Sequence, residues 1–346
     1  MKLTELVIRL KFVCAVWGDA FTNTFLNVCL PSMLSEGNLQ FVAAHSDSSY
    51  HIYTLTSDVE SIDRSPSVRK LRSLMPVEVV RPEADLPDGD KDKPYALMVA
   101  AHADFIKKSN SDGSAMVFIP PDTVWGNGSF RRLLEIAQDG KRLVMLGSAR
   151  LEKESFLLSL QRYMKGGVLP GISKRDLVRL AMNHLHNETE SLVWNSGVLN
   201  IWPSILFWKV KREGLILRAF HLHPLMVRPH IGSNVIPLAA SIDGDYLANV
   251  CPDPADEYIV LDSDEIVAFE LSTRRYREDQ ISFQRLNPAF IAKWANAVIN
   301  ATDSRHRQFI EHRIRLHAKA FSKTWKAVEE DSDRVVREIR VFLAGG

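Results

Sequence analysis

The 346-residue chain has only three cysteines, Cys14, Cys29 and Cys251, and none of them belongs to a CxxC pair. An odd number of cysteines in apolar stretches indicates neither a disulfide framework nor a zinc cluster. Long hydrophobic runs are also missing, because Arg9, Lys11 and Asp19 interrupt the apolar N-terminal stretch. We therefore expect a protein of a reducing, cytoplasmic compartment with no targeting segment and no transmembrane helix; peripheral membrane contact through a local patch is left open.

An excess of one charge is absent as well. Lys and Arg number 43 and Asp and Glu number 42, which gives a formal net charge of +1. A nearly neutral chain has no broad positive field to hold a phosphate polymer, so nucleic acid is not an expected partner. The sequence also has no GxGxxG, no Walker loop and no GxSxG. These absences argue against a dinucleotide oxidoreductase, a phosphate-loop ATPase and a serine hydrolase.

The first half of the chain alternates short apolar runs with longer amphipathic stretches. This pattern predicts an α/β fold with a mostly parallel central sheet and flanking helices. We expect strands near residues 11–17, 50–56, 76–80, 115–120 and 141–147. We expect helices over residues 20–35, 66–75 and 95–108.

The second half is predicted to add further strands and a helical end. Residues 191–202 look like a strand or a tight strand pair, and residues 215–228 look like one strand. A helix-rich tail runs from Pro288 to Leu343. We therefore predict one α/β domain over residues 1–285 and a helical C-terminal extension over residues 286–346.

Polar residues follow three of the expected strands. Trp17, Gly18 and Asp19 follow the first, Asp58 follows the second, and Asp122 follows the fourth. Parallel α/β sheets bind ligands at the carboxyl ends of their strands, so these side chains are candidates for a ligand site. A turn or helix-cap role for Asp122, and a packing role for Trp17, are the alternatives.

This order of strands and acidic turns resembles the glycosyltransferase-A fold, that of nucleotide-diphospho-sugar transferases, over residues 11–230. In that family an Asp-x-Asp motif after an apolar strand holds a divalent metal, and Asp122 stands at the matching position. The stretch Asn195-Ser196-Gly197 resembles the segment that lines the sugar pocket, and His221 and His223 stand where a late metal-binding histidine occurs. Two histidines that alternate along a strand face opposite sides, so at most one of them would bind the metal.

The resemblance implies a bacterial-type glycosyltransferase that moves a sugar from a nucleotide diphosphate donor to a glycan or lipid-linked acceptor, as in polysaccharide biosynthesis. Trp17, Gly18, Asp19 and Asp58 would then contact the nucleotide, and Asn195, Ser196 and Gly197 the sugar. Asp122 with His221 or His223 would hold Mn²⁺ or Mg²⁺, which offsets the charge of the departing diphosphate. A homodimer is possible, and no catalytic residue is assigned.

One departure from the family pattern opens alternatives. Pro120 stands where the first acidic residue of Asp-x-Asp would be. The pairs Asp243/Asp245 and Asp262/Asp264 are second choices for the metal, although each could be a simple turn. The chain could then be an inactive relative that binds a glycan or a protein, or a metal-dependent nucleotidyltransferase that uses Asp262 and Asp264. Residues 303–317, rich in Arg and His and including His317, look like a solvated helix face or a patch for an acidic partner.

Overall fold

The computed structural model describes residues 8–81, 94–110, 112–163, 171–194, 196–230, 242, 245–282, 285–299 and 305–344. The chain forms two compact units that interleave along the sequence. The first consists of Met1–Met145, Val168–Gly171 and Pro224–Ile259, and the second of Leu146–Gly167, Ile172–His223 and Val260–Gly346.

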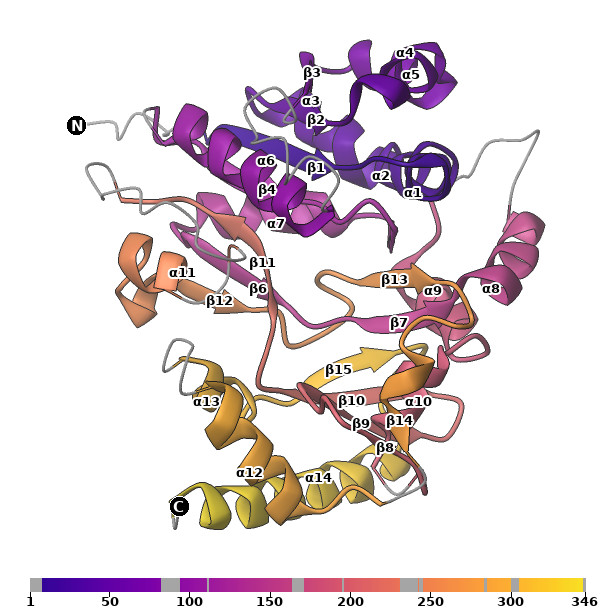
Figure 1. Ribbon diagram of the computed structural model, residues 1–346, viewed down its shortest axis with the longest axis vertical. Helices are drawn as coiled ribbons and strands as arrows, with labels where there is room; N and C mark the ends of the chain where they lie inside the picture. The colour runs from indigo at the N-terminus through magenta and orange to yellow at the C-terminus, as the bar shows by residue number, and fades with distance from the viewer. Residues whose placement is uncertain are drawn as a thin grey trace. The chain divides into compact units, whose positions relative to one another are not determined.

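A seven-stranded sheet is the centre of the first unit (Figure 1). Its strand order is β3-β2-β1-β4-β11-β6-β12. The strands are β1 (Leu10–Ala15), β2 (Ser49–Tyr53), β3 (Val77–Val80), β4 (Ala115–Phe118), β6 (Leu143–Leu146), β11 (His223–Val227) and β12 (Glu257–Ile259). Strand β1 pairs in parallel with β2 and β4, whereas β11 is antiparallel to β4. The sheet is therefore mixed and mostly parallel.

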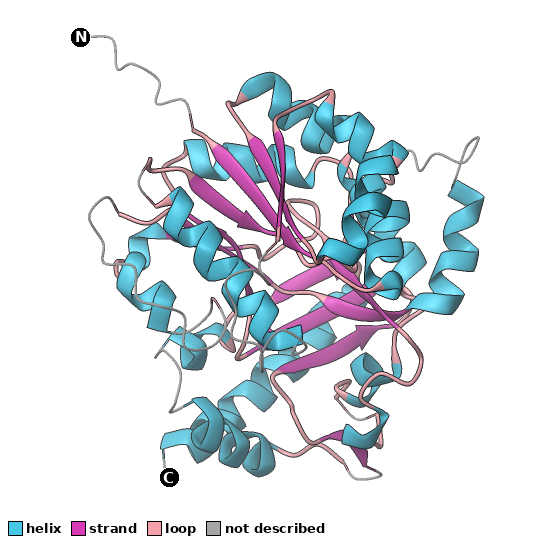
Figure 2. Cartoon of the chain, turned by 45° about the horizontal axis from the view of Figure 1, so that its top comes forward, coloured by secondary structure: helices cyan, strands magenta, loops and turns pink. Residues whose placement is uncertain are grey.

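Helices flank this sheet (Figure 2). They follow the strands as the alternation of the sequence predicts, and the short strand β5 (Thr123–Trp125) precedes α7. The helical segments of the first unit are α1 (Asp19–Thr24), η1 (Phe25–Cys29), α2 (Leu30–Met33), η2 (Glu36–Gln40), α3 (Phe41–His45), η3 (Thr56–Asp58), α4 (Val59–Arg64), α5 (Pro66–Arg72), α6 (Pro94–Ser109), α7 (Ser129–Gln138), α11 (Asp245–Val250) and η6 (Pro254–Asp256).

Aromatic side chains fill the core between the sheet and its helices. Phe12 on β1 is fully buried, and its ring lies 5.9 Å from that of Tyr50 on β2 and 5.3 Å from that of Phe130 on α7. Strands β4 and β6 are buried along their whole length. Continuous burial explains why these two strands read as unbroken apolar runs in the sequence.

The second unit contains smaller sheets and the C-terminal helices. Strands β10 and β9 form an antiparallel pair, and β10 pairs with β15 in the same way. Strand β13 is parallel to β7, and β14 pairs with β8. The elements are β7 (Ala149–Glu152), α8 (Lys153–Leu160), η5 (Gln161–Tyr163), α9 (Lys174–Ala181), α10 (Asn187–Ser191), β8 (Leu199–Asn200), β9 (Ile205–Val210), β10 (Gly214–Ala219), β13 (Ala268–Ser272), η7 (Glu278–Gln280), β14 (Ile281–Ser282), α12 (Pro288–Ile299), α13 (Arg305–Phe309), β15 (Ile314–His317) and α14 (Lys323–Ala344).

The C-terminal helices pack on strands β9 and β10. Their shared core includes Trp208 and Ile216 from the strands and Trp325 and Ile339 from α14, all of them buried. Apolar residues on α14 recur on one face because the helix turns every 3.6 residues, which produces the stripe that covers the strands. The predicted α/β class with a helical C-terminal segment is confirmed.

The five strands predicted in the first half of the chain are all confirmed. Two later predictions are wrong. Residues 215–228 form not one strand but two, β10 and β11, which belong to different sheets. The predicted helix over residues 303–317 is the short helix α13 followed by the strand β15.

The expected strand or strand pair over residues 191–202 is reduced to β8, a strand of two residues. The boundary predicted at residue 285 stays a prediction, and the two compact units do not use it.

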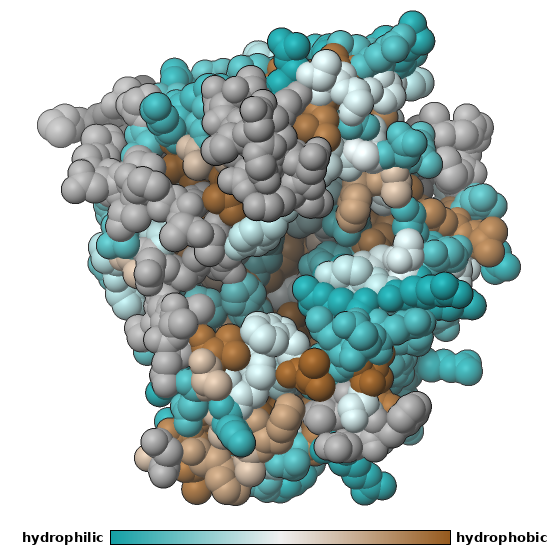
Figure 3. Space-filling view, viewed as in Figure 1, coloured by the Kyte–Doolittle hydropathy of each residue, from teal (hydrophilic) through white to brown (hydrophobic). Residues whose placement is uncertain are grey.

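The face in Figure 3 carries small separate groups of hydrophobic side chains among hydrophilic ones. Within the ranges described above, no helix combines the length and the apolar composition that crossing a bilayer would take.

Candidate metal centre

The second unit contains an acidic turn that begins at Asp262. The amide of Asp264 donates to Oδ1 of Asp262 at 2.8 Å, and the amide of Glu265 donates to the Asp262 carbonyl at 3.0 Å. Aspartate side chains commonly accept from the backbone two residues ahead and so stabilise a turn. The alternation Asp-Ser-Asp in this turn lets both carboxylates lie near one point.

Strand β15 holds this turn in place. Asp262 and Arg315 form a parallel β-bridge, in which the amide of Ser263 donates to the Arg315 carbonyl at 2.9 Å. The amide of His317 donates to Oγ of Ser263 at 3.0 Å. These backbone contacts bring the last residue of β15 beside two aspartates more than fifty positions earlier in the chain.

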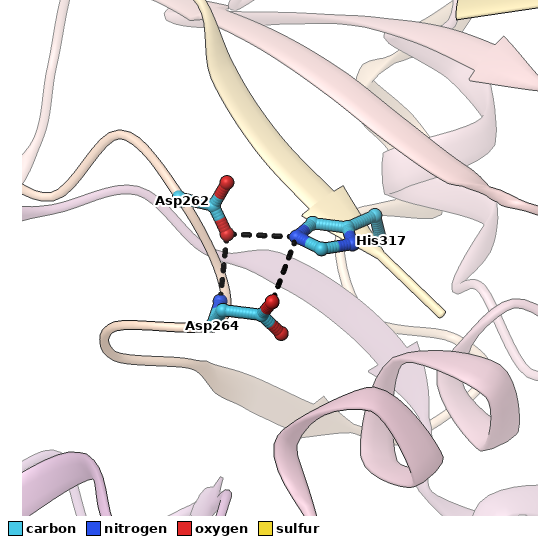
Figure 4. A group of neighbouring side chains, drawn as sticks. All are labelled: Asp262, Asp264 and His317. Carbon is cyan, nitrogen blue, oxygen red and sulfur yellow. Dashed lines mark hydrogen bonds and ion pairs between the residues drawn. The ribbon is translucent and has the colours of Figure 1, made fainter. Parts of the chain in front are cut away.

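Asp262, Asp264 and His317 converge (Figure 4). Nε2 of His317 lies 2.7 Å from Oδ1 of Asp262 and 3.7 Å from Oδ2 of Asp264. One ligand atom from each of the three residues lies within 4.8 Å of the other two. The His317 side chain is 2% exposed, whereas those of Asp262 and Asp264 are 29% and 40% exposed. The cluster is therefore closed on the histidine side and open to solvent on the aspartate side.

The carboxylates change the protonation of this histidine. Burial by itself lowers the pKa of His317, but the hydrogen bonds to Asp262 and to the Lys319 carbonyl, with the nearby negative charge, outweigh burial and raise the pKa. Burial likewise raises the pKa of Asp262, yet the His317 hydrogen bond and the Asp264 amide lower it overall. Without a cation, both shifts favour the form of the pair in which an imidazolium lies beside a carboxylate.

The donor set fits a divalent cation. Nδ1 of His317 lies 2.9 Å from the Lys319 carbonyl oxygen, so Nδ1–H donates to that oxygen and the neutral ring presents its Nε2 lone pair to the carboxylates. Such an outer hydrogen bond fixes the tautomer and orientation of metal-binding histidines. Two carboxylates with one imidazole suit Mn²⁺ better than Mg²⁺. These three side chains would hold the ion.

Helix α9 places two cations at the same turn. The Arg175 guanidinium donates to both carboxylate oxygens of Asp264, with its NH2 group 2.6 Å from Oδ2. Nζ of Lys174 donates to the Asp264 carbonyl at 3.0 Å. An ionised carboxylate has about four lone-pair sites, so Asp264 can accept from Arg175 and still bind a cation.

The residues predicted to contact a nucleotide lie at the carboxyl ends of β1 and β2, in the first unit. Asp58 is buried, and its carboxylate accepts from the Gly18 amide, from Thr22 Oγ1 and from Ser57 Oγ, each at 3.2 Å. Asp19 is exposed at the start of α1, and Trp17 is half-buried. The structure brings Gly18 and Asp58 together, and Asp58 binds the protein's own donors.

Asp122 lies half-buried in the turn after β4. Its carboxylate is close enough to the buried thiols of Cys14 and Cys29 to help raise their pKa values, for which burial is the larger cause. Asp122 belongs to the first unit, while His221 and His223 belong to the second. The metal site predicted from Asp122 and one histidine therefore stays a prediction.

The remaining candidates are distributed as follows. Ser196 and Gly197 are exposed, and Ser196 Oγ accepts from the Val198 amide in a local turn. The half-buried ring of His221 lies 5.1 Å from that of His306, and His223 begins β11. Asn195 and Asp243 lie outside the described residues, and Asp245 begins α11.

Sequence reasoning named Asp262 and Asp264 only as second choices and missed His317 as their partner. The aspartates follow an apolar run, which is the signal of a strand-terminal site. His317 gave no such signal, because it ends a run of basic residues that looks like an exposed helix. Its burial at the end of β15 separates it from that run.

No model of a known protein family matches the chain, and no curated protein matches it. Solved structures that it resembles include mouse xyloside xylosyltransferase 1 in its apo form, with 12% identity over 45% of this chain and 57% of that one, at a TM-score of 0.27. A second is S. aureus TarS, with 8% identity over 88% of this chain and 42% of that one, at a TM-score of 0.34.

A third is a putative glucose-1-phosphate thymidylyltransferase from Bacillus anthracis in complex with a sucrose, with 15% identity over 40% of this chain and 55% of that one, at a TM-score of 0.26. The chain thus spans about half the length of the structures it matches. Likenesses of this strength carry no argument about its activity.

Proposed function

We propose that the chain is a metal-dependent glycosyltransferase that takes a sugar from a nucleotide diphosphate donor and passes it to a glycan or lipid-linked acceptor. The observation that carries this proposal is the convergence of Asp262, Asp264 and His317 around one point. The mostly parallel sheet of the first unit is the scaffold that the resemblance to the glycosyltransferase-A fold predicts.

The chemistry of the donor explains why such a cluster is useful. Negative charge builds on the diphosphate as the bond to the sugar breaks, and a bound divalent cation would offset that charge without a proton transfer. Asp262 and Asp264 supply oxygen ligands, and His317 supplies a nitrogen held by the Lys319 carbonyl. Arg175 adds a guanidinium beside the same carboxylates, suited to bind a phosphate oxygen.

A nucleotidyltransferase is the second candidate, since Asp262 and Asp264 also suit that chemistry. Enzymes that clamp a phosphoryl transfer between two metals hold the ions about 3.5–4 Å apart with shared carboxylates. Here the three ligand atoms lie within 4.8 Å of one another and include one imidazole, which fits a single ion. A single ion supports sugar transfer over nucleotidyl transfer.

Isothermal titration of uridine and guanosine diphosphates, with and without Mn²⁺, tests the donor. We expect heat of binding for one nucleotide, and its loss on addition of a chelator. The double variant Asp262→Asn with Asp264→Asn should abolish the Mn²⁺ dependence, whereas Asp63→Asn, an exposed carboxylate on α4 paired with Arg72, should keep it. No heat with either nucleotide would remove the donor claim.

The original metal candidate is tested in the same assay. If Asp122→Asn abolishes Mn²⁺ binding and the double variant does not, the ion belongs at Asp122 and not at Asp262. Release of the nucleoside diphosphate from a sugar nucleotide would then be measured for turnover. Nucleotide binding without turnover of any donor would favour an inactive binding protein, and pyrophosphate release from a nucleoside triphosphate with a sugar phosphate would favour the nucleotidyltransferase.

The proposal keeps the predicted cytoplasmic location and homodimer. The three cysteines are buried and unpaired, which supports a reducing compartment. Sedimentation of the purified protein tests the dimer.

A further inference from the structure

A cavity of about 390 Å³ lies in the second unit, between the C-terminal end of α8 with η5 and the C-terminal end of α9. Seven residues line it: Ser159, Arg162, Tyr163, Arg179, Leu180, Asn183 and His184. Six of the seven offer polar donors and none is a carboxylate. Its volume is in the range of small-ligand sites.

Arg162 supplies a positive charge that no described carboxylate neutralises. Its side chain is exposed, and it has no hydrogen-bond or ion-pair partner among the residues that the structure describes. A guanidinium offers five N–H donors in a planar fork that matches the oxygens of phosphate and carboxylate. Arg162 can therefore give its whole donor set to a ligand.

Arg179 faces the same cavity with its orientation fixed. Its NH1 group pairs with Asp176, and its NH2 group donates to the Ala318 carbonyl at 3.2 Å. Two of its five donors are thus used by the protein, and the others are available to a ligand. Ala318 directly follows His317, so Arg179 lines the cavity and also donates to the backbone next to a residue of the metal centre.

His184 adds a neutral imidazole ring to the lining. Burial lowers its pKa, and the opposing charge of Glu152 does not restore it, so the ring is neutral at pH 7. Its Nδ1 lies 3.0 Å from Ser155 Oγ, which holds the ring in place beside the cavity. The amide of Asn183 and the hydroxyl of Tyr163 are additional lining donors.

We propose that this cavity, here called the α8–α9 pocket, binds an oxyanion, namely a phosphate monoester or a carboxylate. Arg162 brings a positive charge, Arg179 keeps donors beyond its ion pair with Asp176, and no lining residue is a carboxylate, which together favour a negative ligand. The open mouth suits a small anionic group on a larger molecule. That the pocket binds an anionic group of the sugar acceptor rests on the proposed function. Oxyanion binding itself does not depend on it.

Titration calorimetry with inorganic phosphate tests the pocket. A chelator is present, so that no divalent metal ion can bind the phosphate at the metal centre. We expect saturable binding that Arg162→Ala weakens at least about tenfold, because the variant loses the charge-assisted hydrogen bonds of the guanidinium. Arg334→Ala, which removes an exposed arginine of α14 paired with Asp331 and Glu338, should leave the affinity unchanged. No saturable phosphate binding, or equal affinity in Arg162→Ala, would overturn the proposal.

Two further arms identify the ligand class and separate this proposal from sugar transfer. Glucose 6-phosphate and glucuronate should compete with phosphate, and glucose should not. Competition by glucose would show that the pocket does not select its ligand by negative charge. The Asp262→Asn, Asp264→Asn double variant should keep phosphate binding. Its loss there would assign the anion to the metal centre and overturn the pocket, whereas a failure of nucleotide binding alone would overturn only the proposed function.

Discussion

At the scale of single residues, His317 links metal binding to pH. Hydrogen bonds with Asp262 and the Lys319 carbonyl raise the pKa of this buried imidazole, so the metal-free site keeps a proton on Nε2 to a higher pH than an ordinary histidine does. A cation can bind Nε2 only after that proton leaves. We expect Mn²⁺ affinity to rise as the pH increases above the ordinary histidine pKa of about 6.5. Electron paramagnetic resonance of free Mn²⁺ measures this affinity.

The control for this effect is His317→Gln, which keeps a polar side chain without a titrating ring. Its Mn²⁺ affinity should be lower and nearly flat over the same pH interval. His184→Gln, on α9's C-terminal side, should keep the wild-type slope. An unchanged pH slope in His317→Gln would show that another group sets the proton release.

Arg218 is a charged residue that the fold has placed in a core. Its side chain is 2% exposed on β10, and its guanidinium pairs with Asp333 and donates to the Glu311 carbonyl at 2.7 Å and to Ser332 Oγ at 3.1 Å. Burial is the main reason that its pKa is lowered, and Asp333 opposes the change. This side chain ties β10 to α14.

Replacement of Arg218 by methionine should destabilise the second unit by about 1–3 kcal/mol, because the Glu311 carbonyl loses its donor, whereas Asp333 keeps its ion pair with Arg313. The matched change Arg334→Met, on the exposed face of α14, should cost no more than about 0.5 kcal/mol. Urea unfolding followed by tryptophan fluorescence compares the two variants. Equal midpoints would contradict the role given to Arg218.

At the scale of elements, Asn38 of η2 fixes the start of α7, which lies about ninety positions later in the chain. Its side chain is fully buried, and Nδ2 donates to the carbonyls of Ser32 and Gly126 at 3.1 and 3.2 Å. Its Oδ1 accepts from the Phe130 amide at 3.0 Å. The Asn38 side chain therefore caps α7, although Asn38 itself belongs to another segment. An orphan amide at a helix start thereby gains its acceptor.

Asn38→Ala should therefore destabilise the first unit by about 2 kcal/mol or more, since the buried Phe130 amide loses its acceptor. Asn183→Ala, which removes an exposed amide with one hydrogen bond to the Arg179 carbonyl, should change stability by less than about 0.5 kcal/mol. Thermal unfolding midpoints of both variants measure the difference. A midpoint of Asn38→Ala that equals the wild-type value would exclude the capping role.

The sequence did not predict the boundaries of strands β10, β11 and β15. Residues 215–228 are mostly apolar, and a mostly apolar run does not by itself show a break between two buried strands. Phe220, Leu222 and their neighbours form that break, and β10 and β11 then join different sheets. Strand β15 was missed for a different reason. Arg315 breaks the apolar pattern of this strand, and its side chain pairs with Glu329 on α14.

At the scale of the whole molecule, the metal centre belongs entirely to the second unit. A ligand that binds only the folded state stabilises it by about 2.7 kcal/mol at one hundred times its dissociation constant. We expect saturating Mn²⁺ to slow hydrogen exchange in β15 and the Asp262 turn, and to leave β1 and β2 unchanged. Hydrogen exchange read by mass spectrometry measures both regions at once.

The Asp262→Asn, Asp264→Asn variant is the control for that experiment and should show no Mn²⁺ effect in either unit. Protection that Mn²⁺ adds to β1, β2 and the Asp122 turn instead would move the ion to the first unit.

The sequence by itself determined the α/β class, the five early strands and the turns at Asp122 and Asp262, because hydrophobic periodicity and turn chemistry are local properties. It also presented Asp262 and Asp264 as a pair. Only the tertiary structure decided that His317 completes the pair and that Asp58 and Asn38 serve the protein's own backbone. These contacts join residues between 40 and 92 positions apart, and their partners are set by sheet pairing and packing, which no local pattern encodes.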